Sequence, residues 1–184
     1  MHRLLAYFIL LRKVRGRAVG SFYFIYDSPL GELSIAIGPR GVTDLLIRAD
    51  LKTFLERVRS QSGAAPLFDP ARFTLLKSEL DGYFRGEPVS FSQKLDLSGS
   101  PFERRVWQAI LDIPRGQTRS YAWVAQRAGS PGGARAAGGA AGRNPVPIIC
   151  PCHRVVKADG SIGGYTGGLD IKSRLLMIEG AEFR

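Results

Sequence analysis

Three short apolar runs separated by tight turn sequences constrain the first half of this 184-residue chain more than any other feature. The runs cover residues 22–26, 32–37 and 42–47. Residues 28–31 (Ser-Pro-Leu-Gly) and 38–41 (Gly-Pro-Arg-Gly) lie between them, and proline and glycine favour chain reversal at such positions. Short apolar runs bounded by turns are typical of strands. The pattern therefore predicts a three-stranded antiparallel meander.

Helical spacing replaces the strand pattern after residue 50. Residues 50–60 are compatible with a short helix. A clearer helix is predicted over residues 70–84, where apolar side chains recur at helical spacing and Gly86 follows as a stop signal. Together the strands and helices predict a small α+β domain over residues 21–95, in which no residue looks catalytic.

The second half of the chain follows a linker at residues 96–99 and carries the signals of short helices. Residues 100–103 (Ser-Pro-Phe-Glu) supply an N-cap, a proline at the first helical position and an acid at the third. They predict a helix that ends near Ile113. Ser120 predicts the N-cap of a second helix, which Gly129 terminates.

A third helix is predicted to start at residues 130–131 (Ser-Pro), to carry Arg135 and to end near Gly142. Two short helices joined by a Gly-Ser pair fit a helix-turn-helix. The predicted fold class is therefore α+β. A small N-terminal three-stranded antiparallel sheet with helices is followed by a mainly helical, winged-helix-like C-terminal domain over residues 96–184.

The net charge of +10 is unevenly distributed along the chain. Residues 1–20 carry five Lys or Arg and no acid, residues 21–100 carry nine basic and ten acidic residues, and residues 101–184 carry twelve basic and six acidic residues. A near-neutral segment joined to a basic one indicates a polyanion partner for the basic segment. A solvated basic surface explains the charge equally well, so charge alone leaves both interpretations open.

The first 20 residues form a basic N-terminal extension. Its apolar stretch looks like a short signal peptide, but basic residues follow directly and no small-residue cleavage pattern is present. We interpret it as an extension outside the fold, for example from an upstream start codon. Contact with a membrane is the alternative.

Cysteine usage and hydropathy indicate the compartment. Cys150 and Cys152 are the only cysteines, and their separation by one residue is poor for a structural disulfide. Both thiols are therefore expected to be reduced, in a cytoplasmic protein. No apolar run approaches the ~18–20 residues that a membrane span needs.

The predicted third helix is unusually rich in glycine and alanine. Gly138, Gly139 and Gly142 each cost about 1 kcal/mol of helix stability relative to alanine. In return they leave a nearly bare surface, from which Arg135 is the one long side chain to project. Such a surface suits a helix pressed into a DNA groove. It suits close helix–helix packing as well, and composition does not decide between them.

The candidate chemistry lies at Cys152. A free thiol is only a few per cent thiolate at pH 7, so a nucleophilic cysteine needs help. His153 can act as a base, directly or through a water, and Arg154 adds positive potential. A carboxylate on the other imidazole nitrogen would fix the tautomer. The downstream candidates, among which spacing does not choose, are Asp159, Asp170, Glu179 and Glu182.

The two cysteines allow other interpretations. A structural zinc site needs four ligands, and only His153 is near the Cys-Pro-Cys sequence, so metal binding is disfavoured. Free cysteines are often small core residues, and this is the favoured interpretation of Cys150, which follows two isoleucines. For Cys152 the same inert role stays open on spacing alone.

The surrounding sequence is more specific. Residues 151–155 (Pro-Cys-His-Arg-Val), with Asn-Pro-Val-Pro at 144–147 and Gly-Gly-Tyr-Thr-Gly-Gly-Leu at 163–169, resemble the active-site region of the O6-alkylguanine-DNA alkyltransferases, or methylated-DNA–protein-cysteine methyltransferases. The resemblance covers about residues 100–180 and includes the helix-turn-helix. Residues 21–95 resemble the variable N-terminal domain of that family more weakly.

The resemblance implies a suicidal DNA-repair reaction. Cys152 would take the alkyl group from O6 of guanine, and from O4-alkylthymine, in an irreversible in-line displacement that occurs once per molecule. His153 would activate the thiol through a bound water, and Glu179 would orient His153. Asn144 would brace the turn between the recognition helix and the active-site strand.

The resemblance also implies how DNA is held. Tyr121 would contact the guanine and promote rotation of its nucleotide, and Arg135 would fill the gap left in the stack. Val155, Tyr165 and the backbone of Thr166 would contact the everted base. A reactive atom inside a duplex must leave the stack, at a cost of a few kcal/mol, and a bare helix suits approach through the minor groove.

The expected partner is double-stranded DNA that contains O6-alkylguanine, bound by a monomer without a cofactor. Some family members bind zinc in the N-terminal domain, but residues 21–95 contain no cysteine or histidine, so no metal is predicted. Three rival functions are a catalytically silent binder of alkylated DNA, a cysteine hydrolase and a helix-turn-helix regulator. Cys152 argues against the first, the lack of an oxyanion-hole motif against the second, and a glycine-rich recognition helix against the third.

Overall fold

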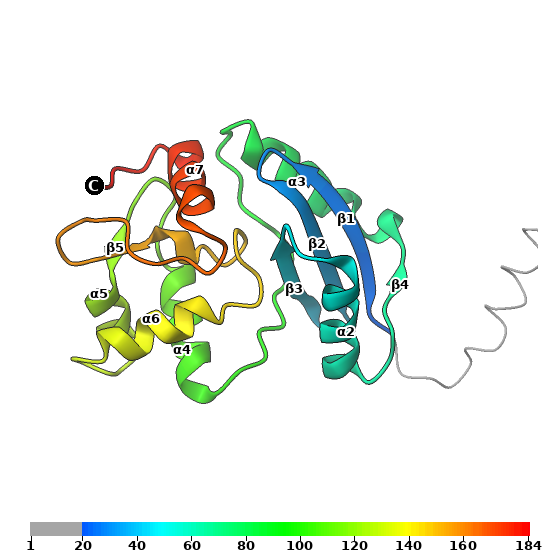
Figure 1. Cartoon of the computed structure of the whole chain (residues 1–184), viewed down its shortest axis with the longest axis horizontal. Coiled ribbons are helices and arrows are strands. Elements are labelled where there is room, and N and C mark those ends of the chain that lie inside the picture. Colours follow the sequence, from blue (N-terminus) through cyan, green and yellow to red (C-terminus); the bar gives the residue numbers. More distant parts are fainter. Residues whose placement is uncertain (1–19) are drawn as a thin grey trace, which may run out of the picture.

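The computed structural model describes residues 20–184, and residues 1–19, which hold almost all of the predicted extension, lie outside them. The described chain has a half built on a sheet and a helical half, which lie side by side (Figure 1). None of the helices within residues 20–184 combines the length and the apolar character needed to cross a bilayer.

The first half is built on a mixed four-stranded sheet in the order β3-β2-β1-β4. The predicted antiparallel meander is confirmed by β1 (Phe22–Ser28), β2 (Gly31–Gly38) and β3 (Gly41–Ile47). The predicted strand number was one too low, because β4 (Leu67–Phe68) pairs in parallel with β1. With only two residues, β4 has no alternating pattern for sequence reasoning to detect.

Three helical segments complete this half. The helix α2 (Leu51–Ser62) is capped by the Asp50 carboxylate, which accepts the Thr53 N–H, and it packs Phe54 and Val58 on one face of the sheet. The predicted second helix is present as the 3₁₀ turn η1 (Pro70–Phe73) followed by α3 (Thr74–Phe84). It covers the opposite face, where the main core lies.

The second half begins with α4 (Pro101–Leu111), whose predicted capping box is confirmed. The Ser100 hydroxyl accepts the Glu103 N–H, and the Glu103 carboxylate accepts the Ser100 N–H at 2.8 Å. The strand β5 (Arg119–Ser120) leads into α5 (Tyr121–Arg127), which the Ser120 side chain caps as predicted.

The next helix, α6 (Ala134–Gly142), starts later than predicted. The predicted start at residues 130–131 was wrong because a turn intervenes: the Gly133 N–H donates to the Ser130 carbonyl and Gly132 has a φ of 82°. Three elements follow along the chain, namely η2 (Cys152–Arg154), β6 (Val155–Val156), which pairs in parallel with β5, and α7 (Leu169–Glu179).

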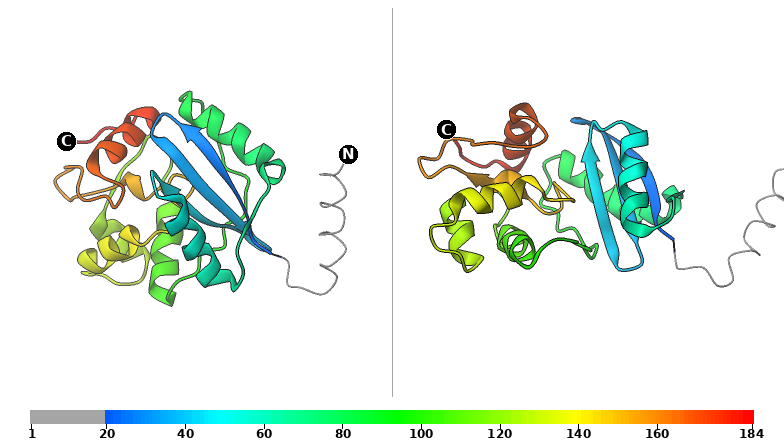
Figure 2. Two further views of the ribbon diagram at one scale, coloured as in Figure 1. Left: turned by 45° about the vertical axis from the view of Figure 1, so that its right-hand side comes forward. Right: turned by 60° about the horizontal axis from the view of Figure 1, so that its bottom comes forward.

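The two halves share one core. Val146, Ile148 and Leu175 of the helical half pack into the same hydrophobic cluster as the inner face of the sheet and α3. A backbone hydrogen bond of 2.8 Å also joins the Leu45 N–H of β3 to the Pro145 carbonyl. The sheet therefore supports the segment between α6 and η2, as the two views of Figure 2 also indicate.

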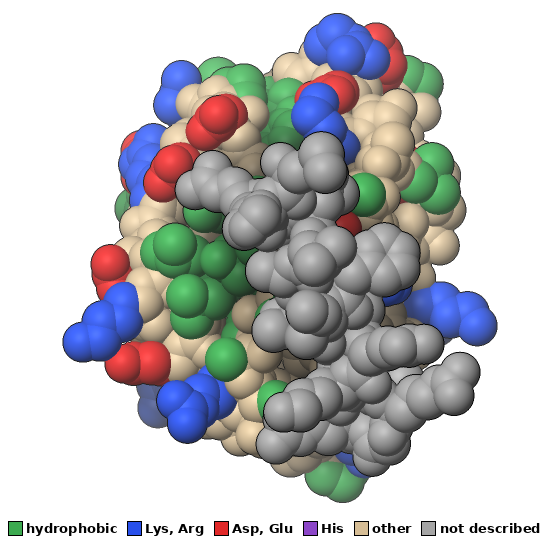
Figure 3. Space-filling model, turned by 90° about the vertical axis from the view of Figure 1, so that its right-hand side faces the viewer, with side chains coloured by type: hydrophobic (Ala, Val, Ile, Leu, Met, Phe, Trp, Pro, Cys, Tyr) green, Lys and Arg blue, Asp and Glu red, His purple; other side chains and the backbone are tan. Residues whose placement is uncertain are grey.

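The outer side of the sheet half exposes large apolar side chains to solvent. Leu67 and Phe68 of the short edge strand β4 remain more than half exposed. Figure 3 views the molecule from this side, where hydrophobic side chains gather beside charged ones. This side is remote from the features described next.

Candidate active site

A tight turn between α6 and η2 holds Cys152. The Asn144 side chain lies inside this turn, where its amide donates to the Cys150 carbonyl at 2.7 Å and to Cys152 Sγ at 3.1 Å. The Asn144 side-chain oxygen accepts the Val146 N–H at 3.1 Å. One amide group thus fixes both ends of the turn and contacts the sulfur directly.

The backbone of this turn is strained at one position. Ile148 has a φ of 75°, although β-branched residues rarely adopt the left-handed region, and its side chain is buried in the shared core. Packing of this kind is needed to hold an unfavourable backbone conformation, which costs on the order of 1–3 kcal/mol. The sheet half therefore helps to keep the cysteine turn in place.

Behind the cysteine lies a buried hydrogen-bonded pair, the His153–Glu179 pair. His153 Nε2 is 2.8 Å from Glu179 Oε1, and both side chains are shielded from solvent. Arg154 donates to the same carboxylate from Nε at 2.7 Å and from Nη2 at 3.0 Å. The other ring nitrogen, His153 Nδ1, is buried and has no hydrogen-bond partner among residues 20–184.

The geometry distinguishes among the candidate carboxylates. Asp159 caps a local turn through Ser161, and Asp170 pairs with Arg48 at 3.0 Å. Glu182 follows α7 and is exposed. Of the four candidates, Glu179 is the one that the fold brings to the imidazole.

A residue of the sheet half joins the pair. The Tyr83 hydroxyl, on α3, donates to Glu179 Oε1 at 2.9 Å. Sequence reasoning missed this residue, because Tyr83 lies on the apolar face of its helix, where helical spacing indicates packing alone. The available signal was its hydroxyl, since a buried tyrosine usually finds a hydrogen-bond partner.

Burial and hydrogen bonds decide the resting protonation states. Burial raises the pKa of Cys152, and the Asn144 amide and the Lys172 charge oppose that effect. Burial lowers the pKa of His153, although Glu179 partly compensates. Burial also opposes ionisation of Glu179, but the bonds from His153 and Arg154 hold its pKa below the usual range. At neutral pH the site therefore holds a thiol, a neutral imidazole and a carboxylate.

A pocket of about 1070 Å³ opens above the sulfur. Cys152, which is 8% exposed, lies in its wall, and Asn144 is beside it. The two predicted DNA-contacting side chains, Tyr121 of α5 and Arg135 of α6, line the same pocket. Residues 163–167 close its other side.

That closing loop is tied to both helices. Tyr121 donates from its hydroxyl to the Gly164 carbonyl at 3.2 Å, and Thr166 donates to the Gly142 carbonyl at 2.8 Å. Tyr165 lines the pocket, and burial raises the pKa of its hydroxyl, as does the neighbouring Cys152. The arrangement brings seven of the nine predicted site residues to one pocket wall or to the cysteine turn, namely Cys152, His153, Asn144, Tyr121, Arg135, Tyr165 and Thr166.

Glu179 stands behind this wall, and Val155 does not reach the pocket lining. The Val155 side chain is fully buried, and its carbonyl accepts a hydrogen bond from Lys172 Nζ at 2.5 Å. Lys172 was missed by sequence reasoning. Its side chain is also fully buried, and its Nζ lies 5.9 Å from the centroid of the Tyr121 ring.

The sheet half also contributes to the pocket. Residues 45–47 of β3, Ala49 and Arg57 line it opposite α6. These positions were assigned to the fold alone, and nothing in their local pattern distinguishes them from other strand and helix residues. Within residues 20–184, no group of three metal-ligating side chains comes together.

Comparison with known families agrees with this geometry. Residues 21–97 match the family model of the 6-O-methylguanine DNA methyltransferase, ribonuclease-like domain, and residues 101–181 match that of the 6-O-methylguanine DNA methyltransferase, DNA binding domain. A methylated-DNA–protein-cysteine methyltransferase of Mycobacterium tuberculosis H37Rv is 43% identical over 157 residues, which cover 85% of this chain and 91% of the relative. A constitutive relative of the same name from Bacillus subtilis is 37% identical over 166 residues, covering 89% and 98% of the two chains.

Solved structures give the same result. A crystal structure of Mycobacterium tuberculosis OGT in complex with DNA superposes with a TM-score of 0.76 at 41% identity, covering 86% of this chain and 92% of that one. The α+β class predicted from the sequence is confirmed by this likeness. The family models match both halves of the chain, and a relative is more than 40% identical to it. The chain therefore belongs to the 6-O-methylguanine DNA methyltransferase family, whose curated members are named methylated-DNA–protein-cysteine methyltransferases.

Proposed function

We propose that this protein repairs O6-alkylguanine in double-stranded DNA by moving the alkyl group to its own Cys152. The observation that carries the proposal is that Cys152 lines one pocket with Tyr121 and Arg135, while the His153–Glu179 pair lies directly behind it. The family membership supports the same reaction. O4-alkylthymine, whose reactive atom is equivalent, would be a second substrate.

In the proposed step the Cys152 proton passes to His153 Nδ1 through one bridging water. The sulfur then forms a bond to the alkyl carbon as the bond between that carbon and O6 breaks. The electrons of the broken bond stay on guanine, which regains a proton. Among residues 20–184 no group near Cys152 is suited to cleave the resulting thioether, so each molecule would act once.

The remaining residues would prepare this step. Glu179 would hold the imidazole with Nδ1 toward the sulfur and stabilise the imidazolium that forms. Asn144, whose amide contacts Sγ, would stabilise the developing thiolate and hold the turn. Both groups act from fixed positions, so little reorganisation accompanies the reaction.

DNA would bind with α6 in its minor groove. Arg135 is exposed on this helix and would occupy the gap in the stack, while Tyr121 would contact the everted guanine. Tyr165 and the Thr166 backbone would close over the base, and Val155 would contribute by its backbone. Basic residues of the second half would bind phosphates without sequence preference.

The protein would work as a cytoplasmic monomer with domains at residues 21–95 and 96–184. All the groups named above come from one chain, and neither cysteine is in a disulfide. A reduced thiol is required for the reaction, which favours a reducing compartment.

Intact mass after incubation with duplex DNA containing O6-methylguanine tests the proposal. We expect a stoichiometric gain of one methyl group, which is lost in Cys152→Ala and kept in Cys150→Ala, the matched buried cysteine. Sustained turnover would instead identify a hydrolase. Binding with no change in mass would identify a silent binder or a regulator.

A further inference from the structure

We propose that Tyr83 is a positioning residue for alkyl transfer, through which the sheet half takes a direct part in the chemistry of the helical half. Its hydroxyl holds the Glu179 carboxylate against His153. The inference rests on the proposed function, because it concerns the rate of that reaction. It assigns a role to a residue that lies outside the segment carrying the cysteine motif.

The contacts on the carboxylate support this role. Glu179 Oε1 accepts three hydrogen bonds, from His153 Nε2 at 2.8 Å, from the Tyr83 hydroxyl at 2.9 Å and from Arg154 Nη2 at 3.0 Å. Oε2 accepts Arg154 Nε at 2.7 Å. Tyr83 is the donor that comes from the opposite half of the molecule, so it restrains the carboxylate from a direction that Arg154 does not cover.

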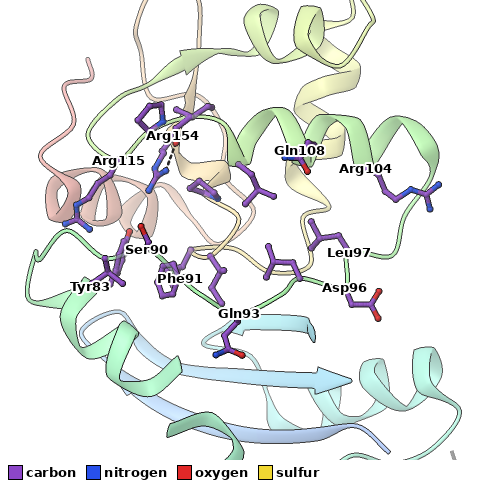
Figure 4. A pocket seen from close by; sticks show the side chains of 18 residues that line it. Tyr83, Ser90, Phe91, Gln93, Asp96, Leu97, Arg104, Gln108, Arg115 and Arg154 are labelled. Carbon is purple, nitrogen blue, oxygen red and sulfur yellow. Dashed lines mark hydrogen bonds between the residues drawn. The ribbon is translucent and has the colours of Figure 1, made fainter. Parts of the chain in front are cut away.

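Tyr83 is itself firmly held. The side chain is 1% exposed, and its ring contacts Phe84 and Phe91 at centroid distances of 5.3 and 5.7 Å. The Arg115 guanidinium lies 5.2 Å from the centre of the ring and donates to the Ile178 carbonyl. Figure 4 shows Tyr83, Arg115 and Arg154 along one side of a pocket of about 800 Å³ between the halves.

The Tyr83 hydroxyl is a donor at every pH at which the protein works. Burial raises the pKa of Tyr83, and the neighbouring Glu179 raises it further. An ionised carboxylate that faces this hydroxyl can only accept its proton. The direction of the hydrogen bond is therefore fixed, and it draws negative charge on Oε1 toward Tyr83.

Tyr83 and His153 both bond to Glu179 Oε1, so the negative charge that this oxygen presents to His153 depends on the Tyr83 hydroxyl. The charged or titratable groups around the pair are Arg154, Lys172, Cys152, Tyr83, Tyr165 and, beyond the ring of Tyr83, Arg115. Removal of the Tyr83 hydroxyl leaves more negative charge for the imidazole, which favours its protonated form. It also frees the carboxylate to move. We therefore expect a slower reaction whose pH dependence shifts to higher pH.

A second tyrosine provides a matched control. The Tyr26 hydroxyl donates to the Asp81 carboxylate at 2.8 Å in the same half of the protein. Tyr26 is also buried and also packs against Phe84, at a centroid distance of 6.0 Å. If the loss of a tyrosine–carboxylate hydrogen bond slowed the reaction only by lowering the stability of the protein, Tyr26→Phe and Tyr83→Phe would both slow it.

The test measures single-turnover methyl transfer from duplex DNA as a function of pH for wild type, Tyr83→Phe and Tyr26→Phe. We expect Tyr83→Phe to react about tenfold more slowly, because a carboxylate that is less firmly held orients the imidazole less well. Its pH–rate midpoint lies at higher pH than in wild type. Tyr26→Phe keeps the rate and the midpoint. Identical behaviour of the two variants would overturn the inference.

Two further measurements separate the role of the Tyr83 hydroxyl from effects on folding and on DNA binding. Incorporation of 3-fluorotyrosine at position 83 keeps the ring and strengthens the donor, so the midpoint is expected to move to lower pH. The rate at which iodoacetamide alkylates Cys152 without DNA is expected to show both shifts. A wild-type protein that takes no methyl group from DNA would defeat the proposed function, whereas the iodoacetamide profiles would still decide the role of Tyr83.

Discussion

At the scale of single residues, the site combines a reactive group with an unreactive resting state. Burial keeps Cys152 protonated and His153 neutral, while Glu179 stays ionised. Lys172 is the unexpected member of this group, a lysine with a fully buried side chain. Its Nζ donates to the carbonyls of Val155 and Gly164, so it joins β6, which follows the cysteine, to the loop that closes the pocket.

Lys172 predicts a measurable pH dependence of stability. Burial lowers its pKa from 10.5 to about 8, so the folded state binds fewer protons than the unfolded state between these values. Its contribution to the free energy of unfolding therefore rises as pH increases through this window, by about 3 kcal/mol. In Lys172→Met this rise is expected to be absent. Urea titrations between about pH 7.5 and 11, which span this window, measure the difference.

The exposed Lys52 of α2 serves as the control. Lys52→Met is expected to keep the wild-type pH dependence. Equal slopes for all three proteins would mean that the Lys172 ammonium is as well solvated in the folded chain as in the unfolded one.

At the scale of elements, α6 is a helix that gives up stability for access. Its glycines leave room beside Tyr121, and a Cβ built at Gly138 would meet the Tyr121 ring at 3.5 Å, an ordinary contact distance. An alanine therefore fits there without steric strain. The absence of a side chain at Gly138 is consequently not required by packing within the protein.

Gly138→Ala is expected to stabilise the fold and to impair repair. The substitution contributes up to about 1 kcal/mol of helix stability. The added methyl group lies in the pocket next to Tyr121, where it displaces the entering nucleotide, and transfer from DNA is expected to slow by roughly fivefold or more. Chemical denaturation and single-turnover transfer measure the two effects.

Gly139→Ala isolates the helix contribution. A Cβ at this position would meet only the flexible guanidinium of Arg143, at 3.4 Å, and Gly139 does not line the pocket. The two variants should therefore gain similar stability. Gly138→Ala that repairs DNA at the wild-type rate would show that this part of α6 stays clear of the nucleotide.

At the scale of the whole molecule, the two halves share one hydrophobic core and are therefore expected to unfold as one cooperative unit. The main core takes its residues from the sheet, from α3 and from the segment around Cys152. Both tryptophans, Trp107 and Trp123, belong to the helical half. Their fluorescence therefore reports on that half alone.

Leu33→Ala in β2 is expected to shift the tryptophan transition. Leu33 is fully buried in the shared core, and truncation of such a leucine costs about 2–5 kcal/mol. Leu75→Ala on α3 is the control, because Leu75 is 57% exposed. An unshifted tryptophan transition in Leu33→Ala would mean that the halves unfold independently.

Local patterns predicted the parts of the fold that local interactions decide. The meander followed from its turns, and the first helix of the second half followed from Ser100 and Glu103, whose capping interaction spans three residues. The start of α6 was misplaced because glycine conformation at Gly132 is not encoded in composition. The edge strand β4 was missed because it depends on pairing with a distant strand.

The site divides in the same way. Cys152 and His153 are adjacent, so spacing made them candidates, and the family motif singled out Cys152 and supplied Glu179. Tyr83 lies 96 positions from Glu179 along the chain, and their contact exists only because α3 and α7 pack on the same core. No periodicity or motif in the sequence relates two such residues.

The small exposed area of Cys152 has a consequence for how the protein is used in the cell. A molecule that reacts once is consumed by any electrophile that reaches its sulfur, such as a peroxide or a small alkylating agent. A sulfur with 8% of its residue surface open to solvent, and a proton still on it, reacts slowly with such compounds. Unreacted protein therefore persists until it binds a lesion in DNA.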